Sequence, residues 1–326
     1  MTVSQAITTP GGLEKMTVAY RNVDGHEILA DVYCGKGNQV RPMIVYIHGG
    51  GLIVGNREMA TSEYDHLEIQ LLSLAEKKNY AVISIDYRLA PETKLPEIVS
   101  DLEAAFSWLG GDGAKRFRLD PERMVVAGFG SAGYLVLLSG YRVNPRPKAL
   151  VALCPFGELN ADWYTKPSPD PKYRAQIVSR EEAVQQTDGT VVSDGARRKG
   201  DGWKIYLHYR QNGLWPQEVS GFSPESFARN ITPYEPVRNV TRQYPPTLLI
   251  HGTQDTDHPI EESQKLSAQF NTHGVPHIFT PIENADHGFI GGDPVQIQNA
   301  YSTMHEFLLR YLEAKETHLN VLQDRL

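Results

Sequence analysis

The feature that most constrains the fold is a series of short, mainly apolar runs that alternate with amphipathic stretches. Runs of this length and composition favour strands that are buried on both faces of a sheet. They occupy residues 43–47, 81–85, 124–127, 150–153 and 247–250. Residues 63–78, 96–109 and 296–313 instead carry apolar side chains at helical spacing. This alternation predicts an α/β fold with a mainly parallel central sheet that helices cover on both faces.

Two segments depart from the alternation. Residues 16–23 and 26–33 alternate apolar and polar side chains around Asp24-Gly25, which predicts a hairpin at the sheet edge. Residues 157–235 have little strand pattern and hold three of the four tryptophans, which indicates a mostly helical cap over the site or, as the alternative, a peripheral aromatic subcore. We predict one domain over residues 1–326 that includes this cap insertion at about 157–235.

Composition excludes several kinds of partner. The 32 basic and 39 acidic residues give a net charge of −7, and no basic run is present to bind nucleic acid. No apolar run is long enough for a signal peptide or a membrane span, which predicts a cytoplasmic protein. Cys154 ends an apolar run far from Cys34, which favours a buried thiol over a disulfide. The sequence neither predicts nor excludes a homodimer.

A glycine-rich turn follows the first predicted buried strand. It reads His48-Gly49-Gly50-Gly51. Backbone amides of Gly49, Gly50 and Gly51 can converge on a developing oxyanion, because glycines let a substrate approach the backbone closely. A simple tight turn is the alternative, whereas a phosphate-binding loop would need a following Lys-Ser or Lys-Thr that is absent here.

Two acid/base residues lie near the end of the chain. Asp255 comes just past a predicted strand, and His287 follows 32 residues later between Asp286 and Gly288. Such a pair can orient an imidazole and move protons, although Asp255 could simply cap a helix and His287 is one of eleven histidines. Asp257 and His258 offer a second acid/base pair beside Asp255. Because no metal-ligand spacing such as HxH or HExxH is present, we predict neither a metal nor a cofactor.

The segment 128–133, Gly-Phe-Gly-Ser-Ala-Gly, looks like the nucleophile elbow of an α/β-hydrolase with its serine one place late. The order of elbow, Asp255 and His287 along the chain is also that of α/β-hydrolases. Together with the glycine-rich turn and residues 86–92, these motifs resemble the hormone-sensitive-lipase-like branch, the α/β-hydrolase fold-3 family, over about residues 20–312. The hairpin at 20–33 is similar to that of fungal members from secondary metabolism.

The resemblance implies roles for these motifs. In the family, the His-Gly-Gly-Gly turn forms the oxyanion hole, and a serine in Gly-Asp-Ser-Ala-Gly-Gly attacks an ester carbonyl. Residues at the positions of Asp255 and His287 complete the triad. This predicts a cofactor-free, esterase-like enzyme that acts on an ester, lactone or activated carbonyl of a small, apolar molecule.

The spacing around the elbow decides which residue takes the position of that serine. In the family the serine lies seven residues after the arginine of an Asp-Pro-x-Arg segment, and seven residues after Arg123 is Gly130. A Gly130 apex also places Gly128 and Ala132 at the two flanking positions that require small residues, whereas a Ser131 apex would place Phe129 there. A glycine further removes the backbone strain of the apex, about 1–3 kcal/mol.

We therefore predict Gly130 at the nucleophile position, with the backbone amide of Ser131 in the oxyanion hole. His287 and Asp255 would then perform acid/base catalysis without an acyl-enzyme, in hydrolysis by activated water or in a cyclisation or elimination. The alternatives are a serine carboxylesterase that uses Ser131 and a small-molecule receptor without activity. The aromatic residues predicted to contact substrate are Trp163, Trp203, Trp215 and Phe129.

Overall fold

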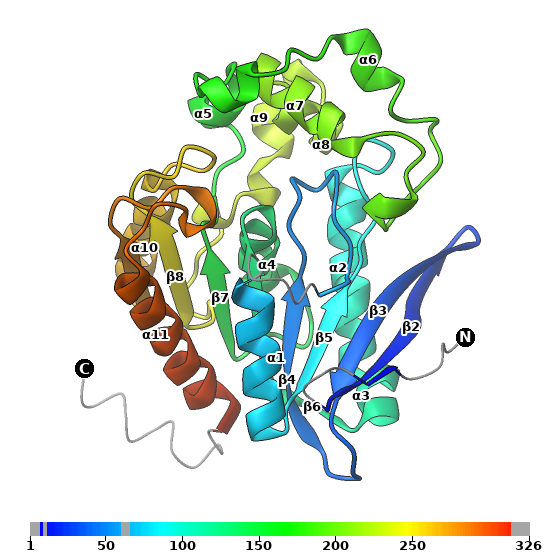
Figure 1. The fold of residues 1–326 in the computed structure, drawn as a ribbon, viewed down its shortest axis with the longest axis vertical. Coiled ribbons are helices and arrows are strands. Elements are labelled where there is room, and N and C mark those ends of the chain that lie inside the picture. Colours follow the sequence, from blue (N-terminus) through cyan, green and yellow to red (C-terminus); the bar gives the residue numbers. More distant parts are fainter. Residues whose placement is uncertain (1–6, 9–11, 60–65, 314–326) are drawn as a thin grey trace.

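One sheet organises the molecule. In the computed structural model, which describes residues 7–8, 12–59 and 66–313, nine strands of the described chain pair in the order β1-β2-β3-β5-β4-β6-β7-β8-β9 (Figure 1). Their bounds are β1 (Ile7–Thr8), β2 (Glu14–Val23), β3 (His26–Cys34), β4 (Arg41–Ile47), β5 (Ala81–Ile85), β6 (Leu119–Phe129), β7 (Ala149–Leu153), β8 (Thr247–Gly252) and β9 (His277–Ile282).

The sheet is parallel from β5 through β9, and β2, β3 and β5 pair in antiparallel fashion. This arrangement confirms the predicted α/β fold. The hairpin of β2 and β3 forms as predicted, but β1 pairs with β2 and takes the edge itself. Strands β4, β5, β7 and β8 are buried along their whole length, because helices cover both faces and leave no side of these strands for polar residues.

Helices form a layer on each face of the sheet (Figure 1). Apolar side chains of α2 (Leu95–Gly110), α3 (Asp112–Phe117), α4 (Ser131–Arg142) and α10 (Glu261–His273) join one core cluster, and those of α1 (His66–Lys78) and α11 (Pro294–Glu313) join the other. Residues 63–65 of the first predicted helix lie outside the described residues. The period-two geometry of a strand sends neighbouring residues to opposite cores, as Val45 and Ile44 of β4 illustrate.

The long connection between β7 and β8 lies over the carboxyl ends of the strands (Figure 1). It contains short helices separated by irregular segments. These helices are α5 (Asp162–Thr165), α6 (Arg180–Val184), α7 (Gly202–Asn212), α8 (Trp215–Ser220) and α9 (Pro224–Asn230), with 3-10 turns η1 (Pro171–Arg174), η2 (Gly195–Arg197), η3 (Thr232–Tyr234) and η4 (Pro236–Arg238). That this cap and the sheet form a single domain stays a prediction.

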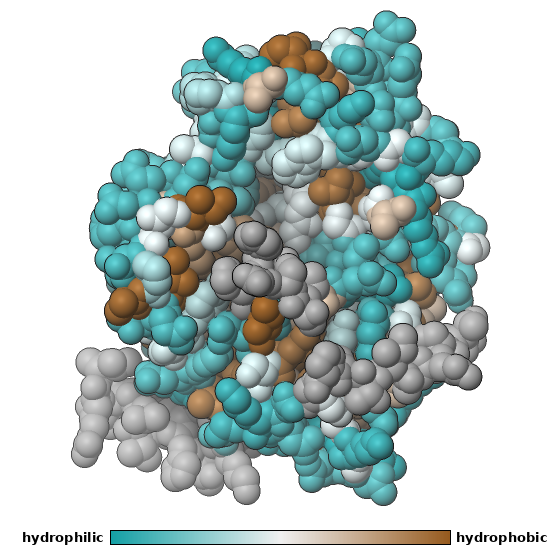
Figure 2. All heavy atoms as spheres, in the orientation of Figure 1, coloured by the Kyte–Doolittle hydropathy of each residue, from teal (hydrophilic) through white to brown (hydrophobic). Residues whose placement is uncertain are grey.

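The exterior is mainly polar. Figure 2 shows one face on which hydrophilic residues dominate and apolar residues form small, separate patches. Within the described ranges, no helix is both long and apolar enough to cross a membrane. Cys34 and Cys154 are both buried and form no disulfide.

Candidate active site

The turn between β6 and α4 has glycine at its apex. Gly130 adopts φ 64° and ψ −123°, and its N–H donates to the carbonyl oxygen of Leu153 at 2.8 Å. A Cβ on Gly130 would lie 3.3 Å from Nε2 of His287 and 3.7 Å from Cε1 of His258. The strand and helix pack closely beside this turn, since a Cβ on Gly128 would lie 2.8 Å from that of Ala132. A side chain at position 130, had the chain one there, would therefore face His287.

Ser131 points its hydroxyl in another direction. It is the first residue of α4 and only 3% exposed. Its Oγ accepts a hydrogen bond from the backbone N–H of Gly51 at 2.8 Å, which is the one bond of this hydroxyl within the described chain. Ser131 thus bridges the elbow and the glycine-rich turn.

Asp255 and His287 lie together beyond the ends of β8 and β9. Nδ1 of His287 donates to Oδ2 of Asp255 at 2.9 Å. Because a carboxylate can only accept, the neutral ring keeps a lone pair on Nε2, the atom that faces Gly130. Burial alone would lower the pKa of His287, but the hydrogen bond and charge of Asp255 outweigh burial and raise this pKa above its ordinary value.

The carboxylate of Asp255 is held in its charged form. Burial opposes ionisation, but hydrogen bonds from His251 and His287 keep the pKa of Asp255 well below its usual range. Its other oxygen, Oδ1, accepts from the backbone N–H groups of Asp257 and His258 at 2.9 and 2.8 Å. These bonds fix the orientation of the carboxylate toward the imidazole.

His258 is a second imidazole beside the elbow. Its ring stands edge-on to that of His287, with 4.8 Å between centroids. Nδ1 of His258 donates to the carbonyl oxygen of Cys154 at 2.9 Å, and burial, then the charge of His287, holds the pKa of His258 well below its ordinary value. The neighbouring Asp257 faces Lys172 at 3.6 Å, and a role of Asp257 and His258 as a second acid/base pair stays a prediction.

The glycine-rich turn requires its glycines. Gly50 and Gly51 have φ of 103° and 64°, and a Cβ on them would lie 2.2 Å from the Val54 carbonyl oxygen and 2.5 Å from the Tyr206 ring. The backbone of Gly51 is held at both of its peptide groups, by Ser131 at its N–H and by Nε1 of Trp215, which donates to its carbonyl oxygen at 2.7 Å. No side chain larger than hydrogen fits at these two positions without a shift of the loop.

The four aromatic residues predicted to contact substrate lie in different surroundings. Phe129 meets the edge of the His287 ring at 4.8 Å between centroids, and Trp163 lies 5.5 Å from His258. Trp215 is fully buried and supports the Gly51 turn, whereas Trp203 is 48% exposed and stacks on Tyr206. Contact with substrate stays a prediction for all four.

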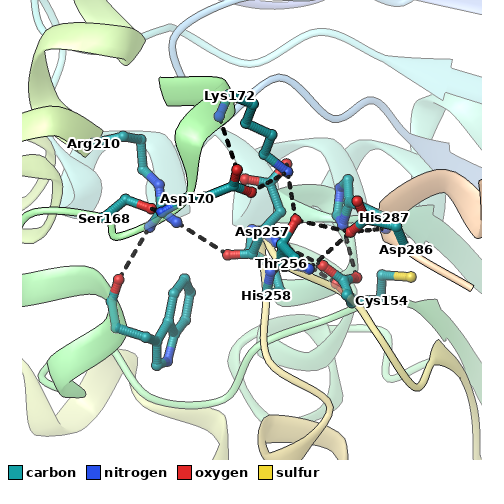
Figure 3. Close-up of polar contacts among 12 residues, drawn as sticks. Cys154, Ser168, Asp170, Lys172, Arg210, Thr256, Asp257, His258, Asp286 and His287 are labelled. Carbon is teal, nitrogen blue, oxygen red and sulfur yellow. Dashed lines mark hydrogen bonds and ion pairs between the residues drawn. The ribbon is translucent and has the colours of Figure 1, made fainter. Parts of the chain in front are cut away.

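The cap is tied to the two acid/base loops by charged residues that sequence reasoning missed (Figure 3). Nζ of Lys172 donates to Oγ1 of Thr256 at 2.9 Å. The N–H of Thr256 donates in turn to Oδ1 of Asp286, which also accepts from the N–H of His287 at 2.7 Å. Arg210 of α7 donates to the Asp257 carbonyl oxygen at 3.2 Å. No local motif marks the bonds of Lys172 to Thr256 or of Arg210 to Asp257, because these partners are distant in sequence.

One group of potential metal ligands lies in the described part of the chain. Atoms of Cys154, His251 and Asp255 fall within 4.8 Å of one another. However, both ring nitrogens of His251 are already bonded, Nδ1 to Ser263 and Nε2 to the carbonyl oxygen of His258. This donor set therefore does not fit a metal ion.

Family models and curated sequences match large parts of this chain. The BD-FAE model matches residues 30–178, and that of the prolyl oligopeptidase family matches residues 206–315. The non-reducing polyketide synthase Preu6 of Preussia isomera is 27% identical over 84% of this chain and 14% of its own length. The 5-methylorsellinic acid synthase of Aspergillus terreus is 26% identical over 91% of this chain and 13% of its own. The chain thus spans only about one seventh of the length of these relatives.

Solved structures share the fold. Esterase 2 of Thermogutta terrifontis, phosphoramylated by tabun, is 21% identical with a TM-score of 0.62, covering 93% of this chain and 97% of its own. A Staphylococcus aureus protein of unknown function is also 21% identical, with a TM-score of 0.69 over 91% of this chain and 99% of its own. These findings confirm the resemblance to esterase-like α/β-hydrolases. The chain therefore has the α/β-hydrolase fold and is similar, over most of its length, to a segment of two fungal proteins, a non-reducing polyketide synthase and a 5-methylorsellinic acid synthase.

Proposed function

We propose that this protein is an enzyme in which His287, oriented by Asp255, acts as a general base at the position that Gly130 leaves open, without a serine acyl-enzyme. The proposal rests on one distance: a Cβ at position 130 would lie 3.3 Å from Nε2 of His287. A serine there would be the nucleophile of an esterase, and glycine leaves room for a water or a substrate group instead.

The proposed reaction begins with proton transfer to Nε2 of His287, from water or from a hydroxyl or acidic C–H group of the substrate. Asp255 stabilises the imidazolium that results, because it accepts from Nδ1 at 2.9 Å. Negative charge collects on a carbonyl oxygen beside the glycine-rich turn and the backbone amide of Ser131. Hydrolysis by the activated water, or a cyclisation or elimination, follows according to which group lost the proton.

The proposed substrate is an ester, lactone or activated carbonyl of a small, largely apolar molecule of polyketide type. Aromatic rings line the neighbourhood of the two histidines, with Phe129 beside His287 and Trp163 beside His258. The relatives are polyketide synthases by name, which supports a polyketide-derived substrate. General acid/base catalysis typically accelerates a reaction by about 10²- to 10⁴-fold, which is enough for a carbonyl that is already activated.

Pre-steady-state kinetics with an activated aryl ester, 4-nitrophenyl acetate, test this proposal. We expect wild type to release nitrophenol without a burst, because no acyl-enzyme accumulates. Gly130→Ser should create a burst with the acyl group on residue 130, located by peptide mass spectrometry, and the double variant Gly130→Ser/His287→Ala should lose it. His273→Ala is the matched control, since that ring only bonds the carbonyl oxygen of Gln269 on its own helix.

Two results would favour the alternatives. A burst in wild type with the acyl group on Ser131 would identify a serine carboxylesterase. Reversible binding of small aromatic esters and lactones without any turnover, unchanged by His287→Ala, would identify a receptor.

A further inference from the structure

We propose that the Ser131 hydroxyl occupies the position that the oxyanion would take in the oxyanion hole of this site. In place of the Gly51 amide, this hydroxyl is then the hydrogen-bond donor that the site presents to a substrate carbonyl. This inference rests on the proposed function, because it concerns the same site. It adds a substrate-contacting role for a side chain at the position where the resembled esterases have alanine.

The first observation is that the Gly51 amide is already used. Its N–H donates to Oγ of Ser131 at 2.8 Å, an ordinary distance for a strong hydrogen bond. A carbonyl oxygen held by an oxyanion hole lies at the same distance from the donating amide. The serine oxygen therefore fills the place that the oxyanion of an acyl-transfer intermediate would need.

The second observation is that the Gly51 amide cannot turn away from the Ser131 hydroxyl and so cannot vacate the position of the oxyanion. The carbonyl oxygen of Gly51 accepts from Nε1 of Trp215 at 2.7 Å, and the Tyr206 ring lies against its Cα. The carbonyl oxygen of Gly50 accepts from the backbone N–H groups of Ile53 and Val54 at 3.0 and 2.9 Å. Movement of the Gly51 peptide would break bonds to both the cap and the turn itself.

The third observation is that the hydroxyl keeps a proton to donate. Ser131 Oγ accepts from Gly51, and within the described residues its O–H has no acceptor. A hydroxyl that accepts from one amide becomes a better donor, because a chain of hydrogen bonds polarises its members. Gly51 N–H, Ser131 O–H and a substrate oxygen would form such a chain.

This arrangement separates two kinds of intermediate. A tetrahedral intermediate that is covalently attached to residue 130 has its oxygen tethered, so it would collide with the Ser131 hydroxyl. An untethered substrate can place its carbonyl oxygen one hydrogen bond further out. The site thus suits proton abstraction by Nε2 of His287, in which the C–H electron pair moves into the enolate and the charge on oxygen is held by Ser131 O–H. No oxidant, leaving group or second reactant is needed for that step.

The test compares Ser131→Ala in a tethered and in an untethered reaction. In the tethered arm, a fluorophosphonate probe labels the Gly130→Ser variant, and the rate is compared with that of Gly130→Ser/Ser131→Ala. We expect the second variant to label about 10²- to 10³-fold faster, the factor associated with one oxyanion-hole donor. Ser131→Gly in the same background should also accelerate labelling. Ser139→Ala is the matched control, because Ser139 is a buried serine of α4 that only bonds the Val136 carbonyl oxygen.

In the untethered arm, Ser131→Ala in the wild-type chain should slow the His287-dependent turnover of 4-nitrophenyl acetate. Opposite signs in the two arms distinguish a substrate-facing hydroxyl from a structural one, whose loss would slow both. Equal labelling of Gly130→Ser with and without Ser131, or slower labelling without it, would overturn the inference. Failure of the proposed function is a separate result, because it would show as a fluorophosphonate adduct on Ser131 of wild type or as wild-type turnover that His287→Ala leaves unchanged.

Discussion

The two halves of the site differ in how closely they resemble the site of a serine esterase. At the ends of β8 and β9, Asp255 and His287 form a hydrogen-bonded pair at 2.9 Å. At the start of α4, the turn keeps the positive φ of 64° and the close approach of Gly128 to Ala132, yet it carries glycine at its apex. Backbone packing therefore maintains this turn without a nucleophile, and the geometry of the Asp255–His287 pair does not depend on one either.

The difference extends to the neighbouring residue. In the acid/base half, each carboxylate oxygen of Asp255 has a partner, and these bonds orient the carboxylate toward His287. In the elbow, the hydroxyl of Ser131 is bonded to Gly51 rather than to His287. In the proposed function, His287 is therefore free to act on something other than a protein hydroxyl.

Removal of the base should have the largest effect on activity. We expect His287→Ala to lower turnover by about 10²- to 10⁴-fold, because the proposed proton transfer is lost. The fold should survive, which circular dichroism would check. Turnover within twofold of wild type would remove His287 from the proposed mechanism.

A methyl group at the apex tests the other half. Gly130→Ala adds a Cβ 3.3 Å from Nε2 of His287, so it should lower turnover by displacing the bound water or substrate group. The positive φ should also cost about 1–3 kcal/mol of unfolding free energy. Gly189→Ala is a matched control, because Gly189 has φ 79° but nothing within 4 Å of its Cβ. An active Gly130→Ala would show that the open position is not used.

The support of the glycine-rich turn by the cap should have a smaller effect. Trp215→Phe removes the Nε1 donor to the Gly51 carbonyl oxygen, which should cost about 0.5–1.5 kcal/mol of unfolding free energy. Trp203→Phe, at an exposed position, should be nearly neutral. Urea denaturation measures the free energy of unfolding of both variants, and equal values would contradict the proposed contribution of the Trp215 Nε1 hydrogen bond.

Two charge changes should shift the pKa of His287 in opposite directions. Asp255 raises this pKa and Lys172 lowers it. Asp255→Asn should therefore move the imidazole titration to lower pH, and Lys172→Met should move it to higher pH by less. Because the neutral ring is the base, the rising limb of a pH–rate profile should move with it. Proton NMR of the imidazole Cε1 signal measures both shifts.

Lys199→Met provides the control for those titrations, since Lys199 pairs with Asp188 of the cap. Shifts of the same sign in Asp255→Asn and Lys172→Met would contradict the electrostatic account.

Local patterns predicted much of the fold and the main chain of the site. The runs 43–47 and 81–85 predicted β4 and β5 because burial on both faces leaves an unbroken apolar signal. Spacing from Arg123 predicted the turn at Gly130, because the length of β6 and the packing of α4 fix that position. The short β1 carries too few residues to show any alternation.

Contacts between distant segments were not predictable in the same way. Ser131 meets Gly51 across 80 residues, and Trp215 meets the same peptide across 164. Nothing in either local sequence specifies these partners, since they follow from how the cap and the two turns converge at the carboxyl ends of the strands. The position of His258 beside His287 has the same origin.

Covalent labelling shows whether a serine nucleophile faces His287. Wild type is treated with a fluorophosphonate probe, and the intact mass is measured with Gly130→Ser as the positive comparison. We expect no adduct on wild type and an adduct on residue 130 of the variant. A stoichiometric adduct on Ser131 of wild type would contradict the proposed function.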